Sequence, residues 1–266
     1  MSGRRNHRRK GSARLSASLR KRSSCILQLM QILVIDIGGT HIKVASTDHR
    51  DSIKIVSGPD MTAVRMTRQV LAVTKDWKYD RVSVGYPGPV AHDHPLAEPH
   101  NLAPGWIDFP YQKIFRKPIR FINDAAMQAL GGYRGGRMLF LGLGTGLGSA
   151  MVLDGVVVPL ELAHLLYKKG RTYEDYVGRA GLELRGKKRW QKSVLDIISR
   201  LQAALICDYV LLGGGNAKLM KNLPGHVILG ANSNAVEGGF RLWQNPDELK
   251  TSANPMKPAA SKTSSK

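Results

Sequence analysis

The sequence predicts an α/β protein made of two similar halves, because two strand patterns interrupted by glycines recur along the chain. Apolar residues 32–35 run into Asp36, and the glycine-rich residues 38–40 separate them from a second alternating stretch. The same order returns where the apolar residues 138–141 enter the glycine-rich segment 142–148 and another strand pattern follows. Each pattern is typical of two strands joined by a tight glycine turn. We therefore expect two glycine turns, one from each half, that can face one another across a cleft and hold an oligophosphate.

The remaining elements follow from apolar periodicity and turn residues. We expect further strands at residues 52–56, 81–84, 119–122, 149–153, 209–212 and 227–229. We expect a helical turn at 161–166 and helices at 61–73, 125–130, 173–184, 188–204, 216–220 and 235–243, with Asp60 as the N-cap of the first. Residues 91–112 are expected to form a loop, in which His92, His94 and His100 match no closed metal site and are solvated.

Composition limits the class of protein. A chain of 266 residues, 42% of them hydrophobic, can bury a sizeable core and form one large domain or two small ones. No apolar run approaches the roughly 20 residues that a membrane span needs, so we expect no membrane partner. Cys25 and Cys207 lie far apart and match no metal-ligand spacing. This cysteine usage predicts a reducing, cytoplasmic location with neither a zinc site nor a disulfide framework.

The net charge of +20 is concentrated in two places. Residues 1–29 contain nine Lys and Arg and no acidic residue, which leaves eleven positive charges for the rest of the chain. Residues 168–192 contain nine basic and three acidic residues. The folded part is therefore expected to carry a local basic patch rather than a uniform positive surface.

These patterns divide the chain into four parts. Residues 1–29 are an Arg/Ser-rich basic extension that we expect to be disordered. Their composition resembles a nucleic-acid-binding arm or a transit peptide, and a protein that starts at Met30 is an equal alternative. We expect residues 30–135 to form an N-terminal α/β lobe, residues 136–244 a C-terminal α/β lobe, and the Pro/Ser/Lys/Ala-rich residues 245–266 a disordered tail.

The glycine turns themselves indicate phosphate chemistry. Glycines at residues 38–39 let backbone N–H groups approach an anion, Thr40 adds a hydroxyl donor, and Asp36 can hold a hydrated Mg²⁺. An ordinary hairpin whose Asp ends the strand is the alternative. The P-loop pattern is absent, and segment 142–148 fails the dinucleotide-binding pattern G-x-G-x-x-G in both frames.

Six short motifs occur in the order found in one family. They are residues 36–43 (Asp-Ile-Gly-Gly-Thr-His-Ile-Lys), 85–89 (Gly-Tyr-Pro-Gly-Pro), 123–124 (Asn-Asp), 143–148 (Leu-Gly-Thr-Gly-Leu-Gly), 161–164 (Glu-Leu-Ala-His) and 213–216 (Gly-Gly-Gly-Asn). This set, within residues 31–243, resembles the ROK-family sugar kinases, and among them most closely the zinc-less bacterial polyphosphate glucokinases. The resemblance implies an α/β fold of the actin/hexokinase-like, two-lobed ribonuclease-H type with a central cleft. It also implies a hexose 6-kinase, a phosphotransferase with an alcohol acceptor.

The resemblance assigns a role to each matching residue. Asp124 is the expected general base. The expected sugar ligands are Asn101, Asn123, Asp124, Glu161, His164 and Glu174. The expected phosphate and cofactor contacts are Asp36, Gly38, Gly39, Thr40, Lys43, Gly144, Thr145, Gly146, Gly214 and Gly215, with Asp36 on the Mg²⁺ side.

Three departures from the family pattern bear on these roles. Most ROK kinases carry a cysteine-rich zinc motif after the Glu-x-Gly-His element, and this chain has none, so His164 is not assigned as a zinc ligand. Ala163 replaces the glycine of that element, which is a small change. Glu174 matches only through the short pattern Tyr-Glu-Asp-Tyr that follows the missing zinc loop.

Some of these residues have a structural alternative. Asn-Asp before an alanine-rich helix is also a good N-cap, so Asp124 is either the base or part of a cap. Glu161 and His164, three residues apart on one face of a turn, are either sugar ligands or a buried structural pair.

The phosphoryl donor and the sugar stay open at this point. Arg185, Lys188 or Arg189, and Lys192 recur at helical spacing, and this stripe either binds a long polyphosphate or is a solvated helix face. The zinc-less form favours polyphosphate, with ATP as a further donor. The acceptor is glucose, mannose or a related hexose.

A function of another class is a non-catalytic ROK-type sugar-sensing regulator. Such regulators carry an N-terminal helix-turn-helix, for which residues 1–29 are too short and lack apolar periodicity. The same observation argues against specific nucleic-acid binding, although the basic extension could bind nucleic acid alongside a kinase activity. A homodimer is common in the family.

Overall fold

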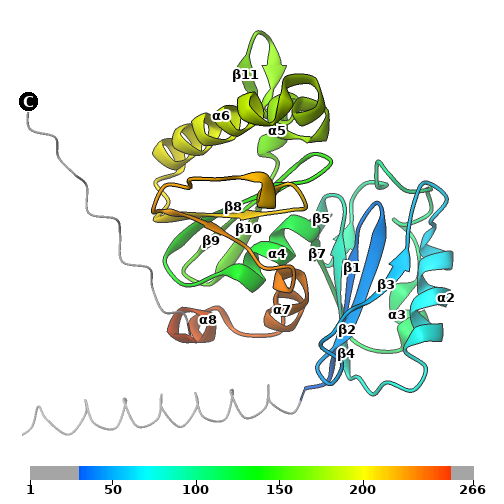
Figure 1. The fold of residues 1–266 in the computed structure, drawn as a ribbon. Helices are drawn as coiled ribbons and strands as arrows, with labels where there is room; N and C mark the ends of the chain where they lie inside the picture. The colour runs from blue at the N-terminus through cyan, green and yellow to red at the C-terminus, as the bar shows by residue number, and fades with distance from the viewer. Residues whose placement is uncertain (1–29, 253–266) are drawn as a thin grey trace, which may run out of the picture.

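The computed structural model describes residues 30–252 and consists of two α/β lobes, each built on a five-stranded sheet (Figure 1). The predicted basic extension, residues 1–29, lies outside the described residues. Within the described part of the chain, no helix is both long and apolar enough to cross a membrane.

The sheet of the N-terminal lobe has the strand order β3-β2-β1-β4-β7. Its strands are β1 (Ile32–Ile37), β2 (His41–Ser46), β3 (Ile53–Val56), β4 (Arg81–Tyr86) and β7 (Ile119–Asn123). Strands β1 to β3 are antiparallel neighbours, whereas β1, β4 and β7 run parallel. All six residues of β1 are buried, as expected for an apolar run at the centre of a sheet that is covered on both faces.

The sheet of the C-terminal lobe repeats this plan in the order β10-β9-β8-β13-β14. Its strands are β8 (Arg137–Leu143), β9 (Leu147–Leu153), β10 (Val156–Leu160), β13 (Tyr209–Gly213) and β14 (Val227–Leu229). Strands β8 to β10 are antiparallel, and β8, β13 and β14 are parallel. The repeated order confirms the predicted two-lobed ribonuclease-H-type architecture.

The helices follow the predicted order, with local corrections. They are α2 (Ala63–Val73), α3 (Tyr111–Phe115), α4 (Asp124–Gly132), α5 (Tyr173–Val177), α6 (Arg179–Leu205), α7 (Asn234–Arg241) and α8 (Pro246–Ser252), with the 3₁₀ turns η1 (Leu162–His164) and η2 (Ala217–Leu219). The prediction of Asp60 as an N-cap is wrong, because Thr62 caps α2 and its hydroxyl accepts from Arg65 N–H at 3.2 Å. The predicted helix 216–220 is only the short turn η2.

Two segments that were expected to lack regular structure contain some. The predicted loop 91–112 takes part in the small hairpin of β5 (Val90–Ala91) and β6 (His94–Pro95) and contains the start of α3, and its three histidines are exposed as expected. The predicted disordered tail is wrong at its start, since residues 246–252 form α8 and Leu249 packs into a core cluster. Residues 253–266 lie outside the described range.

Alternation along β1 decides which side chains meet which helices. Leu33 and Ile35 pack with α2 and α3, which cover one face of the sheet (Figure 1). Ile32 and Val34 instead join one core with α4 and α7, which lie between the two sheets. Because side chains alternate along a strand, Asp36 shares the face of Ile32 and Val34. Its carboxylate therefore points to the junction of the lobes.

Helix α7 ties the two lobes together. Ser83 Oγ donates to Gly239 O at 2.6 Å and accepts from Trp243 Nε1 at 2.9 Å. These two bonds fix α7 and the residues directly after it on β4. Helices α4 and α7 touch backbone to backbone, because a Cβ on Gly131 would lie 1.8 Å from Asn234 O. The division at residues 135 and 136 stays a prediction, and α7, from the second half of the sequence, packs on the sheet of the first lobe.

Candidate active site

The turn between β1 and β2 contains the first group of predicted phosphate contacts. Gly38 N–H donates to His41 O at 3.1 Å and closes the turn, which leaves Gly39 and Thr40 exposed. A Cβ added to Gly39 would lie 3.4 Å from Asn101 Cβ. The predicted sugar ligand Asn101, which is exposed, therefore borders the first glycine turn.

Asp36 ends β1 as a carboxylate that is 6% exposed. Its Oδ2 accepts from Nζ of Lys43, its cross-strand partner on β2, at 3.0 Å. A buried carboxylate is costly without such a partner. The sequence assigns Lys43 to the phosphate, and the structure places its ammonium on Asp36. The other oxygen, Oδ1, faces Gly85, where a Cβ would lie 3.4 Å from it.

The glycine loop between β8 and β9 is held by its carbonyl groups. Asn216 donates twice, from N–H to Leu143 O at 2.9 Å and from Nδ2 to Gly144 O at 3.1 Å. Arg179 N–H donates to Thr145 O at 3.0 Å. Within the described residues, the N–H groups of Thr145 and Gly146 have no protein acceptor. Adjacent free N–H groups on a fixed loop form a concavity that suits an anion.

The third glycine motif lies directly against this loop. Gly214 has φ +80°, and a Cβ there would lie 2.4 Å from Leu143 O. Only glycine meets both conditions without strain. Gly214 and Gly215 are exposed beside the loop, so the structure brings the two predicted phosphate motifs together.

Glu174 braces the same loop from α5. Its Oε2 accepts from Leu147 N–H at 2.9 Å, and a Cβ on Gly146 would collide with that oxygen at 2.1 Å. The sequence does not predict this positioning contact. The assignment of Glu174 to a sugar hydroxyl stays a prediction.

The segment at the end of β7 separates the two alternatives for Asn123 and Asp124. Asn123 is the N-cap of α4, since its Oδ1 accepts from Ala126 N–H at 3.1 Å and its Nδ2 donates to Gly88 O at 3.2 Å. Asp124 is the next residue and is partly exposed. Its Oδ1 accepts from Ala125 N–H at 2.8 Å. The cap is therefore Asn123, and the carboxylate of Asp124 is not needed for it.

The electrostatic environment of Asp124 is unusual for a carboxylate. Burial raises the pKa of Asp124 to about 7, with the negative charge of Asp36 as the next cause and that of Glu161 as a smaller one. The hydrogen bond from Ala125 N–H lowers this pKa in part. Three carboxylates, from the end of β1, the start of α4 and the approach to η1, thus act on one region. A carboxyl group that titrates near neutral pH is suited to proton transfer.

Glu161 and His164 flank the turn η1 and both are exposed, so the alternative of a buried pair is wrong. The turn is fixed by Ser149, whose Oγ donates to Leu160 O at 2.8 Å and accepts from Leu162 N–H at 3.1 Å. Ala163, at the position of the family's glycine, is buried. The exposed pair therefore stands on a rigid support.

Helix α4 brings the carboxylate and the second glycine loop together. A Cβ on Gly148, two residues beyond the loop, would lie 2.9 Å from Ala125 Cβ. Asp124 precedes Ala125, so the helix that carries the predicted base packs on the strand that leaves the glycine loop. Among residues 30–252, no group of three or more His, Cys, Asp and Glu has the arrangement of a metal site.

Two residues of this site are absent from the sequence prediction. Asn216 holds the glycine loop by its side chain, and its place at the end of the Gly-Gly-Gly-Asn motif is the signal that could have found it. Arg179 contributes only its backbone N–H to the loop, and a backbone contact leaves no residue-type signal.

Known proteins resemble this chain in sequence and in fold. No family model matches the chain. The polyphosphate glucokinase of Mycobacterium tuberculosis (strain ATCC 25177 / H37Ra) is 26% identical over 206 residues, which cover 68% of this chain and 76% of that protein. The polyphosphate glucokinase of Mycobacterium leprae (strain TN) is likewise 26% identical over 206 residues, which cover 62% of its length.

Solved structures share the fold. The inorganic polyphosphate/ATP-glucomannokinase of Arthrobacter sp. strain KM has a TM-score of 0.66 at 22% identity and covers 84% of this chain and 99% of its own. A ROK family glucokinase from Streptomyces griseus, in complex with glucose and AMPPNP, has a TM-score of 0.62 at 16% identity, over 79% and 98% of the two chains. A ROK family transcriptional regulator has a TM-score of 0.61 at 16% identity, over 83% and 78%.

The fold is therefore the actin/hexokinase-like, two-lobed one of these proteins. The comparisons confirm the resemblance to ROK-family sugar kinases that the ordered motifs indicate, and the sequence matches confirm the resemblance to polyphosphate glucokinases.

Proposed function

We propose that this protein is a hexose kinase, which transfers a phosphoryl group from polyphosphate or ATP to the 6-hydroxyl of glucose or a related hexose. One observation carries the proposal. Asp124, a carboxylate whose pKa burial raises to about 7, begins the helix that packs beside a glycine loop in which two N–H groups have no acceptor among the described residues. The resemblance of the ordered motifs to ROK-family sugar kinases implies that Asp124 acts on the acceptor and that the loop binds the donor.

Asp124 is the general base of the proposed reaction. Transfer to an alcohol requires that the hydroxyl proton leave as the oxygen attacks the phosphorus atom. A base works best when its pKa lies near the working pH, and burial brings that of Asp124 there. Because Oδ1 is held by Ala125 N–H, the side chain is oriented and Oδ2 is left for the sugar hydroxyl.

The glycine turns bind the donor. The N–H groups of Thr145 and Gly146 point their partial positive charge at the phosphates, and those of Gly39 and Thr40 do so from the other lobe, on a turn that Gly38 N–H closes. Their positions are fixed by contacts behind the loop, so little reorganisation is needed as charge develops. Gly214 and Gly215 line the nucleotide side when ATP is the donor.

The residues present fit a Mg²⁺ ion at Asp36. In phosphoryl-transfer sites Mg²⁺ is usually held by one or two carboxylates together with the phosphates of the substrate. Asp36 has one oxygen on Lys43 and another that faces Gly85, and this second oxygen could hold the ion. The bound ion would offset negative charge on the phosphates.

The sugar hydroxyls are bound by three exposed side chains and by the buried Asn123. Glu161 and His164 stand on the fixed turn η1, and Asn101 borders the first glycine turn. Asn123 has one amide hydrogen committed to Gly88 O, so its sugar contact uses the other.

The test is a phosphorylation assay with glucose and mannose as acceptors and with polyphosphate and ATP as donors. We expect the wild-type protein to phosphorylate glucose with polyphosphate at least as well as with ATP. Asp124→Asn should lower kcat by about 10²–10⁴-fold while glucose still binds, measured by titration calorimetry. The Asn variant keeps the oxygen that accepts from Ala125 N–H, so it serves as its own structural control. Wild-type turnover in this variant would refute the role of Asp124.

A second candidate is a non-catalytic sugar-sensing regulator, which the shared fold with a ROK family transcriptional regulator favours. A regulator would bind glucose without turnover from any donor, and its affinity for a specific duplex DNA would respond to the sugar. Phosphorylation of glucose by the purified protein decides between the two.

A further inference from the structure

A pocket of about 360 Å³ lies in the C-terminal lobe between helix α6 and the hairpin of β11 (Leu166–Lys168) and β12 (Arg171–Thr172). It is lined by Lys169, Arg171, Tyr176, Leu184, Arg185 and Arg189, and we call it the Tyr176 pocket. Four of these six side chains are cationic and none is acidic. No residue of the site described above lines it.

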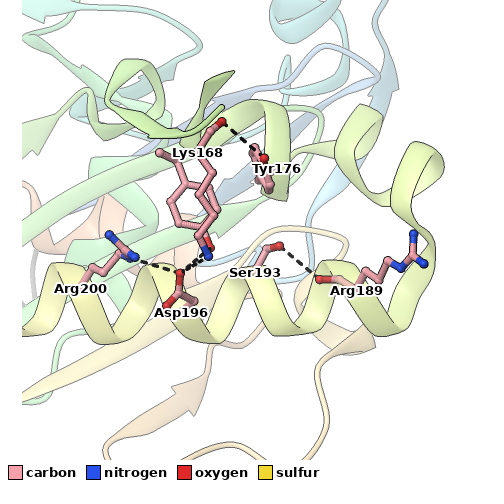
Figure 2. Close-up of polar contacts among 7 residues, drawn as sticks. Lys168, Tyr176, Arg189, Ser193, Asp196 and Arg200 are labelled. Atoms are coloured by element: carbon pink, nitrogen blue, oxygen red, sulfur yellow. Dashed lines mark hydrogen bonds and ion pairs between the residues drawn. The ribbon is translucent and has the colours of Figure 1, made fainter. Parts of the chain in front are cut away.

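The two walls of the pocket are held together by a polar network. Lys168 Nζ and Arg200 Nε both donate to Asp196 Oδ2, at 2.8 and 3.2 Å (Figure 2). Tyr167 OH donates to the same oxygen. Figure 2 also shows Tyr176, whose hydroxyl donates to Lys168 O at 3.4 Å. The hairpin is therefore anchored on α6, which keeps its cations beside those of the helix.

The side chain of Arg185 is placed to bind an anion. Its guanidinium carbon lies 3.5 Å from the centroid of the Tyr176 ring, so the aromatic face supports the group and leaves the edge donors free to bind. Its Nε is buried and has no acceptor among the residues that the structure describes. Asp175 on α5 accepts from Thr172 N–H and Oγ1 at 2.8 and 3.0 Å, and these hydrogen bonds, with smaller contributions from the charges of Arg171 and Arg185, lower its pKa.

A break in α6 adds to the positive potential. Gly186 is non-helical, with φ 71° and ψ 158°, so a second helical segment starts after it. The first N–H groups of a helical segment have no partner within the helix and carry partial positive charge. Arg185 and Arg189 stand on either side of this start and both line the pocket.

Helices α5 and α6 each contact the glycine loop with one residue and line the pocket with another. Arg179, the first residue of α6, donates its N–H to Thr145 O of the loop at 3.0 Å. Arg185 lies six residues further along, or about 9 Å at the rise of an α-helix. On α5, Glu174 contacts the loop and Tyr176 lines the pocket. A chain of phosphates that begins at the loop would need to span a distance of about this size to enter the pocket.

We propose that the Tyr176 pocket binds phosphate groups of a long polyphosphate chain, distant from the group that is transferred at the glycine loop. This inference rests on the proposed kinase function. One arginine guanidinium can bind two phosphate oxygens at once. Several cations that bind along a polyanion also release its counterions, which favours binding. A short donor held at the glycine loop does not extend into the pocket, so the pocket selects for chain length.

The test compares two pocket variants, Lys169→Ala and Arg185→Ala, with Lys78→Ala, an exposed lysine of the N-terminal lobe that lies outside the pocket. Each variant removes one positive charge. We expect the pocket variants to raise KM for long-chain polyphosphate about 10-fold, with KM for ATP and for glucose within 2-fold of wild type. Lys78→Ala should stay within 2-fold for all three. Equal KM values for polyphosphate in all variants, or equal losses in the control, would overturn the proposal.

A binding measurement separates this proposal from the proposed function. Titration calorimetry of the full chain with long-chain polyphosphate, tripolyphosphate and orthophosphate requires no turnover. We expect long chains to bind more tightly than the short anions, and this preference to be lost in Lys169→Ala and Arg185→Ala. If the wild-type protein has no kinase activity but shows this pattern, the kinase function fails and the pocket stands. Equal affinity for orthophosphate and long chains would overturn the pocket as a polyphosphate site.

Discussion

The two lobes share one strand plan, but they differ at the positions that matter for chemistry. In the N-terminal sheet, Asp36 pairs across the strands with Lys43 on one side and Gly85 on the other. The equivalent position of the C-terminal sheet is Gly142, whose partners are Gly148 and Gly213.

The same fold thus holds an ion pair in one lobe and only glycines in the other. A carboxylate near the phosphates can hold a cation, whereas a loop without side chains lets a phosphate chain approach the backbone N–H groups. We infer that the N-terminal lobe supplies charge and proton transfer, and that the C-terminal lobe supplies the loop that binds the phosphoryl donor.

The largest expected effect comes from Gly214→Ala, which disturbs the donor-binding loop of the C-terminal lobe. The φ of +80° and the approach to Leu143 O leave no room for a Cβ, so the glycine motif must move away from the loop. We expect kcat/KM for the donor to fall about 100-fold and the affinity for glucose to stay unchanged. Gly225→Ala, where a Cβ meets no neighbour, is the control. Donor kinetics at wild-type level would contradict the assignment of this lobe.

An intermediate effect is expected from Glu174→Ala, which removes the brace on the loop. A hydrogen bond to a charged group contributes about 1.5–3 kcal/mol, which predicts a rise in KM for the donor of about 10-fold or more. Glu174→Gln keeps an acceptor for Leu147 N–H and should restore most of the loss. If Glu174 instead binds the sugar, both variants will raise KM for glucose and leave that for the donor unchanged.

The smallest effect is expected in the N-terminal lobe from Lys43→Met. Without its ion pair, Asp36 presents more negative charge to Asp124 and raises the pKa of Asp124 further above its ordinary value. A base acts only when deprotonated, so wild-type kcat/KM should fall about 10-fold per unit below pH 7. In Lys43→Met the midpoint of this profile should move up by a few tenths of a unit. A rise in KM for the donor at every pH would show instead that Lys43 binds phosphate.

Local patterns made much of this structure predictable. Apolar runs, glycine turns and their repetition indicate the strands and the two-lobed plan, because strand period and turn chemistry are properties of neighbouring residues. Predictions from these patterns fail where a segment contains few of them. Helix α8 lies in a Pro/Ser/Lys/Ala-rich segment, and it forms because Leu249 finds a core to pack against.

The sequence predicts which residues belong to the site better than it predicts the contacts that they make. Asp124 and the glycine loop stand out as residue types in motifs, and the structure places them together through Ala125 and Gly148. The partner of Glu174 was not predictable, because the carboxylate bonds a backbone N–H, and every residue but proline offers one.

The sequence by itself determined the order of the strand–glycine–strand units and the residue types that they present. Only the tertiary structure decided that Lys43 pairs with Asp36, that Asn123 rather than Asp124 caps α4, and that cations of a hairpin and a broken helix enclose one pocket. The physical reason is that period and turn chemistry act between near neighbours, whereas burial and charge depend on which distant segments pack together.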